Sequence, residues 1–292
     1  MTLDRRLHPF REDLAAESLR EKVSATAFTQ GTLKSVRASL VPLHRAPDRT
    51  SLMDTQILMG DSFTVYEEKN GWVWGQAGSD GYVGYIPADT LGPWNGEPTH
   101  RVNVLRTFYY TEPDIKAAVL GFLTMNAGVQ IKQFEGSFAQ TSQGYWIYAQ
   151  HLSPWHKPLS DDFVSIAEQY IKTPYQWGGK SSIGIDCSGL IQMALAAIGI
   201  FAPRDTDMQE KDLGHIIEWN SDLSGLQRGD LLFWKGHVAV MTSPTTMLHA
   251  TARHMLTYTE PVVQAEERIR VRKGIPLSCI KRLDITHKTA AP

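Results

Sequence analysis

The period of the hydrophobic pattern changes near residue 158, and this change most limits what the chain can fold into. Between about residues 33 and 155, short alternating runs such as Tyr82-Val83-Gly84-Tyr85-Ile86 are separated by Gly, Asn and Asp. This pattern is typical of short β-strands joined by turns. After residue 158, apolar residues recur at helical spacing. We therefore predict a multidomain protein, with all-β domains followed by an α+β domain.

The β segment contains a degenerate internal repeat. Gly81-Tyr82-Val83-Gly84-Tyr85 is similar to Gly144-Tyr145-Trp146-Ile147-Tyr148, and the copies end in Pro93-Trp94 and Pro154-Trp155. A period of about sixty residues with about five short strands per copy suits two small barrels. Both copies resemble bacterial SH3-like domains, which we place at residues 33–95 and 96–157.

The N-terminal segment, residues 1–32, is predicted to be helical. Residues 11–23 are strong helix formers, and Leu14, Leu19 and Val23 form a thin apolar stripe. The pattern predicts a docked N-terminal helix.

The last domain, residues 158–292, is predicted to combine helices with an antiparallel sheet. Phe163, Ile166 and Tyr170 lie on one face of a first helix, and a second helix begins at Cys187 and ends before Gly199. Strands are expected at five places: residues 229–234, 237–241, 246–250, 268–271 and 279–283. This is an α+β layer arrangement.

Cys187 is the candidate nucleophile of this domain. A thiol attacks an amide as a thiolate, which a helix N-terminus and a nearby histidine favour. His237 and His249 begin or lie within two predicted strands that could bring their rings together. Each residue alone would more often be structural, and Cys279, in an apolar stretch, is interpreted as a core residue. Both cysteines are expected to be reduced.

Six motifs in order resemble those of the NlpC-type, papain-like cysteine peptidases that act on bacterial cell-wall peptides. They are Pro174-Tyr175-Gln176-Trp177-Gly178-Gly179, Asp186-Cys187-Ser188-Gly189-Leu190, Pro203-Arg204-Asp205-Thr206, Gly229-Asp230-Leu231-Leu232-Phe233, Gly236-His237-Val238-Ala239 and Leu248-His249-Ala250. The resemblance covers about residues 160 to 285. It implies a triad of Cys187, His237 as base and His249 as the residue that orients the base. It also implies that Tyr175 stabilises the oxyanion with the backbone N–H of Cys187.

Two SH3-like domains before the peptidase resemble a subgroup that cleaves γ-D-glutamyl bonds in murein peptides with a free N-terminal L-alanine. The resemblance implies that Asp186, Asp61 and Tyr82 bind the ammonium group, and Ser188 is counted with them as substrate-binding. The subgroup usually has Gly-Glu where this chain has Gly60-Asp61, which is one methylene shorter. In simpler interpretations Asp186 caps a helix, Asp61 lies in a turn and Tyr82 packs in a core.

Charge and composition narrow the possible partners. With 29 Lys and Arg against 31 Asp and Glu, the formal charge is −2, so nothing drives broad binding to nucleic acid or to an anionic membrane.

The first residues lack the apolar core of a signal peptide, and a cytoplasmic location is expected. No cofactor is expected. A metal is disfavoured because Cys187, His237 and His249 include no closely spaced ligand pair. The oligomeric state is open.

The function hypothesis is a cytoplasmic cysteine peptidase of murein recycling. It would cut the bond between γ-D-glutamate and meso-diaminopimelate or lysine and release L-Ala-γ-D-Glu. Two alternatives remain open at this point. One is a secreted endopeptidase that acts on the intact wall, with the SH3-like domains as anchors. The other is an inert protein whose SH3-like domains bind peptides.

Overall fold

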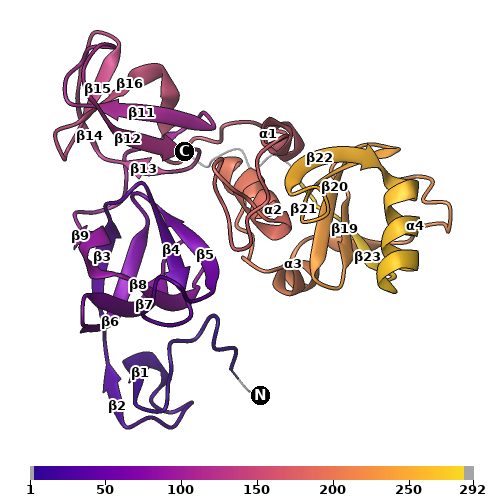
Figure 1. Ribbon diagram of the computed structural model, residues 1–292, viewed down its shortest axis with the longest axis horizontal. Coiled ribbons are helices and arrows are strands. Elements are labelled where there is room, and N and C mark those ends of the chain that lie inside the picture. Colours follow the sequence, from indigo (N-terminus) through magenta and orange to yellow (C-terminus); the bar gives the residue numbers. More distant parts are fainter. Residues whose placement is uncertain (1–2, 286–292) are drawn as a thin grey trace. The chain divides into compact units, whose positions relative to one another are not determined.

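The fold is described from a computed structural model, and the residues described are 3–285. The chain forms two compact units, Met1–Trp155 and His156–Pro292. The regular elements of unit 1 are strands and short 3-10 turns, whereas unit 2 contains α-helices packed on one sheet (Figure 1). Within residues 3–285, every helix is too short or too polar to serve as a transmembrane segment.

The N-terminal segment does not form the predicted helix. Residues 11–23 instead contain strand β1 (Leu14–Ala16) and a 3-10 turn, η1 (Glu17–Leu19), and β1 pairs in parallel with β2 (Ala27–Thr29). A lone helix of this length is marginal in water, and a stripe of three apolar residues buries little surface. Backbone pairing with β2 therefore outweighs helix propensity.

The strands that follow form one seven-stranded sheet, which we call the N-terminal β region (residues 32–93). Its strand order is β5-β4-β8-β7-β6-β3-β9. The strands are β3 (Thr32–Val36), β4 (Leu40–His44), β5 (Met53–Leu58), β6 (Ser62–Lys69), β7 (Trp72–Ala77), β8 (Val83–Pro87) and β9 (Leu91–Pro93), with a 3-10 turn η2 (Ala88–Thr90) before β9. Alternate residues of these strands, including Val41, Leu43, Phe63 and Val73, fill one buried core.

The central β region (residues 100–154) repeats this pairing pattern. Its strands are β10 (His100–Val102), β11 (Arg106–Tyr110), β12 (Val119–Thr124), β13 (Gly128–Val129), β14 (Ile131–Glu135), β15 (Phe138–Thr141), β16 (Trp146–Tyr148) and β17 (Leu152–Pro154), with a 3-10 turn η3 (Ala149–His151) before β17. β10 pairs with β13 and β17 as β3 pairs with β6 and β9, and β11 pairs with β12 and β16 as β4 pairs with β5 and β8. The internal repeat predicted from the sequence is confirmed at the level of strand pairing.

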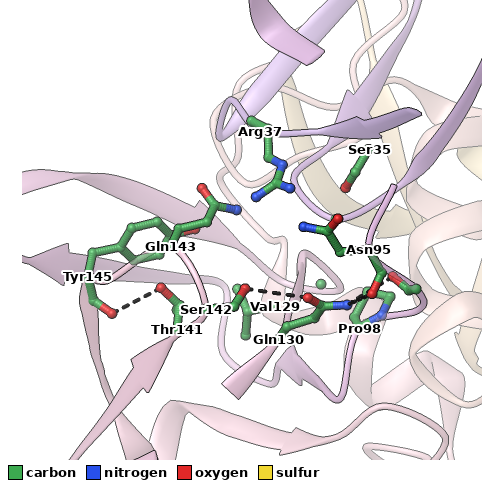
Figure 2. A pocket seen from close by; sticks show the side chains of 13 residues that line it. Ser35, Arg37, Asn95, Pro98, Val129, Gln130, Thr141, Ser142, Gln143 and Tyr145 are labelled. Atoms are coloured by element: carbon green, nitrogen blue, oxygen red, sulfur yellow. Dashed lines mark hydrogen bonds between the residues drawn. The ribbon is translucent and has the colours of Figure 1, made fainter. Parts of the chain in front are cut away.

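A small polar pocket lies where the two β regions meet (Figure 2). Arg37 and Asn95 line it on one side, and Gln130 and Ser142 on the other. The Gln130 side chain donates to the backbone oxygen of Asn95 at 2.8 Å and accepts from the Ser142 hydroxyl at 3.4 Å. The bond to Asn95 joins the central β region to the segment that connects the two β regions, and the bond from Ser142 holds the Gln130 side chain in place.

Gly60 lies where the backbones of the two β regions come into contact. It has a φ of +86°, and a Cβ there would collide with the backbone carbonyl of Gly128. The N–H of Gly128 also donates to the carbonyl of Met59 at 2.7 Å. Only glycine permits both this backbone conformation and this approach.

We predict that Gly60→Ala destabilises unit 1 by about 2 to 4 kcal/mol, because it adds a steric collision to the cost of a positive φ. Gly71→Ala is the matched control. Gly71 also has a positive φ, +76°, but nothing lies within 4 Å of its Cβ position. The control should cost only about 1 kcal/mol. Urea unfolding of the full chain, followed by hydrogen exchange in unit 1, measures both. Equal losses in the two variants would show that the collision is relieved at no cost.

Unit 2 is built on a six-stranded antiparallel sheet with the order β18-β23-β19-β20-β21-β22. The strands are β18 (His215–Ile217), β19 (Leu231–Trp234), β20 (His237–Ser243), β21 (Thr246–Thr251), β22 (Leu256–Pro261) and β23 (Leu277–Arg282). The helices are α1 (Phe163–Gln169), α2 (Cys187–Ala197), α3 (Thr206–Asp212) and α4 (Val262–Lys273). Figure 1 shows α2 and α4 on opposite sides of this sheet.

The strand predicted at residues 268–271 is wrong, because this segment belongs to α4. Arg268-Ile269-Arg270-Val271 alternates like a strand over four residues. Over the longer window, however, Val262, Ala265 and Ile269 lie three and four residues apart, and all three are buried in the same core cluster. That spacing matches the face of a helix, and the longer pattern decides the fold. The other predicted helices and strands of this unit are present with shifted ends.

Candidate active site

Helix α2 begins at Cys187, as the sequence predicted. Asp186 is the N-cap residue: its backbone is extended, and its Oδ1 accepts a hydrogen bond from the N–H of Gly189 at 2.7 Å. The cap satisfies one of the amide groups that a helix start leaves without a partner. The thiol therefore lies at the positive end of the helix dipole, which favours negative charge on sulfur.

Asp186 is also half of a buried ion pair. Arg204, whose side chain is 1% exposed, donates to Oδ2 at 2.7 Å and to Oδ1 at 3.0 Å. The carboxylate accepts further hydrogen bonds from the N–H of Gly178 at 2.9 Å and from the hydroxyl of Ser188 at 3.3 Å. Arg204 in turn donates to that hydroxyl at 2.9 Å. Asp186 and Ser188, two of the four predicted substrate-binding residues, thus share one hydrogen-bond network. Their roles toward substrate stay predictions. Any ammonium that reached Asp186 would meet a carboxylate already neutralised by Arg204.

Burial raises the pKa of the Cys187 thiol to about 11, and the charge of Asp186 acts in the same direction. The N–H groups of Val238 and Ser188 and the hydroxyl of Thr206 lower it in part. Val238 follows His237 in β20. Because its N–H contacts the sulfur, the thiol of Cys187 lies next to this part of β20. A thiol with this pKa is protonated at neutral pH, so attack on a carbonyl requires a base that takes its proton.

The two predicted histidines lie in contact. His237 begins β20 and His249 lies in β21, and Nε2 of His237 is 2.8 Å from Nδ1 of His249. His237 is partly exposed, whereas His249 is 1% exposed. Burial lowers the pKa of His249, although Glu260 partly opposes this effect. This arrangement is compatible with the predicted roles of His237 as base and His249 as the residue that orients it, and these roles stay predictions.

A carboxylate and a guanidinium extend this chain of contacts beyond the histidines. Oε1 of Glu260 lies 2.9 Å from Nε2 of His249, a charge contact without the alignment of a good hydrogen bond. Arg268 of α4 pairs with both oxygens of Glu260, at 2.6 Å for Nη2 and Oε1. Sequence reasoning missed both residues, because neither belongs to any of the motifs.

Tyr175 lies in the loop before α2 and is half-buried. Burial raises the pKa of its hydroxyl, and the nearby Cys187 and Asp186 raise it further. The hydroxyl is therefore protonated at neutral pH and able to donate a hydrogen bond to an oxyanion. This placement is compatible with the predicted role, which stays a prediction.

Thr206 and Gln209 of α3 lie near Cys187 or its helix, and sequence reasoning did not assign them a role. The Thr206 hydroxyl is 3.9 Å from the sulfur of Cys187. The buried amide of Gln209 donates to the carbonyl of Ser188 at 2.9 Å and to that of Pro203 at 2.8 Å. The signal available was the motif Pro203-Arg204-Asp205-Thr206, which marks where α3 approaches α2.

Asp61 and Tyr82 have structural environments within unit 1. The carboxylate of Asp61 accepts from the N–H of Leu58 at 3.1 Å, in the turn between β5 and β6. Tyr82 is 4% exposed and belongs to the core cluster of the N-terminal β region. Their proposed contact with substrate stays a prediction. Cys279, in β23, is free and buried, as expected for a core residue.

Two stretches of the chain match known protein families. Residues 172–268 match the NlpC/P60 family, and this stretch contains Cys187, His237 and His249. The chain carries an NlpC/P60 cysteine-peptidase domain. Residues 43–91 match the bacterial dipeptidyl-peptidase Sh3 domain, which covers most of the N-terminal β region. The order of an SH3 domain before an NlpC/P60 domain agrees with the sequence prediction.

Similarity to individual proteins extends beyond the NlpC/P60 domain. Dipeptidyl-peptidase 6 of Lysinibacillus sphaericus is 29% identical over 240 residues, which cover 74% of this chain and 86% of the relative. The gamma-D-glutamyl-L-lysine dipeptidyl-peptidase of Bacillus cereus is 28% identical over 231 residues, covering 68% of this chain and 67% of the relative. A crystal structure of an NlpC/P60 family protein from Bacillus cereus shares the fold, with a TM-score of 0.70 over 86% of this chain and 99% of the other at 20% identity.

Proposed function

We propose that this protein hydrolyses the γ-D-glutamyl bond to a diamino acid in murein peptides that have a free N-terminal L-alanine. One observation carries the proposal: similarity to two relatives named as dipeptidyl-peptidases spans 74% and 68% of the chain and includes both units. The peptidoglycan endopeptidase RipB of Mycobacterium tuberculosis, by contrast, matches only 32% of the chain. Release of a dipeptide requires recognition of a free N-terminus, which an endopeptidase of intact wall does not need.

The chemistry follows from the residues of unit 2. The thiol of Cys187 gives its proton to His237, and the sulfur attacks the carbonyl carbon of the γ-glutamyl bond. The oxyanion that forms accepts hydrogen bonds from the Tyr175 hydroxyl and the N–H of Cys187. The adduct then collapses: the C–N bond breaks, His237 gives its proton to the leaving amine of the diamino acid, and the γ-glutamyl group stays on Cys187 as a thioester. A water molecule, deprotonated by the same histidine, hydrolyses the thioester and regenerates the thiol.

Three finer points belong to this proposal. The central β region is a second SH3-like domain, which the repeated strand pairing supports. The ammonium of L-alanine is recognised by carboxylate and hydroxyl groups, for which Asp186, Ser188, Asp61 and Tyr82 are the candidates. The enzyme serves recycling of wall peptides in the cytoplasm.

The test compares L-Ala-γ-D-Glu-meso-diaminopimelate with the same peptide acetylated at its N-terminus, and each with its lysine analogue. We expect the acetylated peptides to be cleaved at least about thirtyfold less efficiently, because loss of a charge pair at a recognition site costs about 2 kcal/mol or more. Liquid chromatography of the released L-Ala-γ-D-Glu gives kcat/KM. Equal cleavage of free and acetylated peptides would favour the wall endopeptidase. Binding without cleavage would favour the inert binding protein.

A further inference from the structure

We propose that Glu260, held by Arg268, is a positioning residue that fixes the proton arrangement of His249 and His237 and thereby prepares His237 to accept the proton of Cys187. The contacts of Glu260 are with His249, Arg268 and Tyr258, and it acts through His249. The inference concerns the peptidase machinery and does not depend on which peptide is cleaved.

The hydrogen-bonding inventory determines where each proton lies. A lone pair on Nε2 of His249 would face the ionised carboxylate of Glu260 at 2.9 Å and be repelled by it, so Nε2 carries the proton. In a neutral ring the other nitrogen, Nδ1, then has a free lone pair. Because Nε2 of His237 lies 2.8 Å from that atom, Nε2 of His237 is the donor. Nδ1 of His237 is then unprotonated, which is the form in which His237 can accept the proton of the thiol.

Glu260 must be ionised for this argument to hold, and its surroundings keep it so. Burial raises the pKa of Glu260, but contacts with His249, Arg268 and Tyr258 outweigh burial and hold the pKa well below its usual range. Arg268 pairs with both carboxylate oxygens. A bidentate guanidinium of this kind fixes the plane of the carboxylate as well as its charge.

The groups around His249 come from several elements, and Glu260 stands out among them. His237 comes from β20, Tyr258 and Glu260 from β22, Arg268 from α4, and His254 from the turn between β21 and β22. Burial, Arg268 and His254 lower the pKa of His249, whereas Glu260 raises it. Glu260 is thus the group that favours positive charge on the paired imidazoles, which is the charge that forms when His237 takes a proton.

The same contacts could serve only to join β22 to α4, and an experiment separates the two roles without any substrate. The rate of alkylation of Cys187 by iodoacetamide, followed by mass spectrometry of the peptide that contains it, reports how readily the thiolate forms beside His237. In Glu260→Gln we expect alkylation at pH 7 to fall about tenfold and the rise of rate with pH to move to higher pH, because a less stabilised imidazolium supports the thiolate less well.

Glu266→Gln is the matched control, because Glu266 also pairs with an arginine of α4, Arg270 at 3.3 Å, in the same helix but outside this chain of contacts. It should leave the alkylation profile unchanged. An unchanged profile in a folded Glu260→Gln variant would overturn the proposal. If that variant fails to fold, nitrogen-15 NMR of the unmodified protein decides: a proton on Nε2 of His249 supports the proposal, and a proton on Nδ1 refutes it.

Discussion

Replacing Cys187 by alanine will lower peptide hydrolysis by between about 10³-fold and 10⁶-fold, because the covalent route is lost while substrate binding remains. Cys279→Ala is the matched control: it removes the other thiol of the chain, which lies in β23 and contacts Glu210 at 3.6 Å. Its activity should stay within about twofold of the unmodified protein. Steady-state kinetics with L-Ala-γ-D-Glu-meso-diaminopimelate measure both variants.

The second arm of this experiment tests whether the thiol and the histidines act as one unit. His237→Ala alone should cost nearly as much as Cys187→Ala, and the double variant should be little worse than either single one, since groups in one catalytic unit are strongly non-additive. Residual activity in Cys187→Ala near that of the unmodified protein would refute the nucleophile. Additive losses would mean that His237 contributes to something other than activation of Cys187.

The sequence predicted those parts of the fold in which a local pattern agrees with the tertiary packing. Helix α2 was predicted from a capping residue followed by apolar residues at helical spacing, and both features exist in the structure. The helix predicted at residues 11–23 was wrong because helix propensity was supported there by an apolar stripe of only three residues, and pairing with β2 formed instead. The strand predicted at residues 268–271 was wrong because a window of four alternating residues is too short to distinguish a strand from one face of a helix.

In the candidate site, too, residues within local motifs could be predicted, and residues that only the tertiary fold brings together could not. Cys187, His237 and His249 lie within motifs, so their positions could be predicted. Glu260 reaches His249 only because the register of β21 and β22 sets Tyr258 opposite His249 and Glu260 two residues further along. No spacing in the sequence encodes that register. Arg204 lies within one of the six motifs, but its partner Asp186 is 18 residues away in the sequence. Only the fold brings the two charges together.

Arg204→Met will destabilise unit 2 by about 3 to 5 kcal/mol, because it leaves the buried carboxylate of Asp186 without its countercharge. Methionine retains much of the volume of arginine, so the loss reports charge more than packing. Arg228→Met is the matched control: Arg228 also makes two ion pairs, with Asp162 and Glu168, but its side chain is 37% exposed. Pairs exposed to this extent contribute about 1 kcal/mol or less. Urea unfolding read by hydrogen exchange in unit 2 compares the two.

The variant Asp186→Asn/Arg204→Met separates charge from shape. It removes both charges of the pair while the asparagine can still cap α2, so we expect it to recover at least about half of the stability lost in Arg204→Met. If the double variant is as unstable as the single one, the contribution of Arg204 lies in its hydrogen bonds to Ser188 and the neighbouring loop instead. If it recovers stability but not activity, the Asp186 charge acts on the reaction itself, beside the thiol whose pKa it raises.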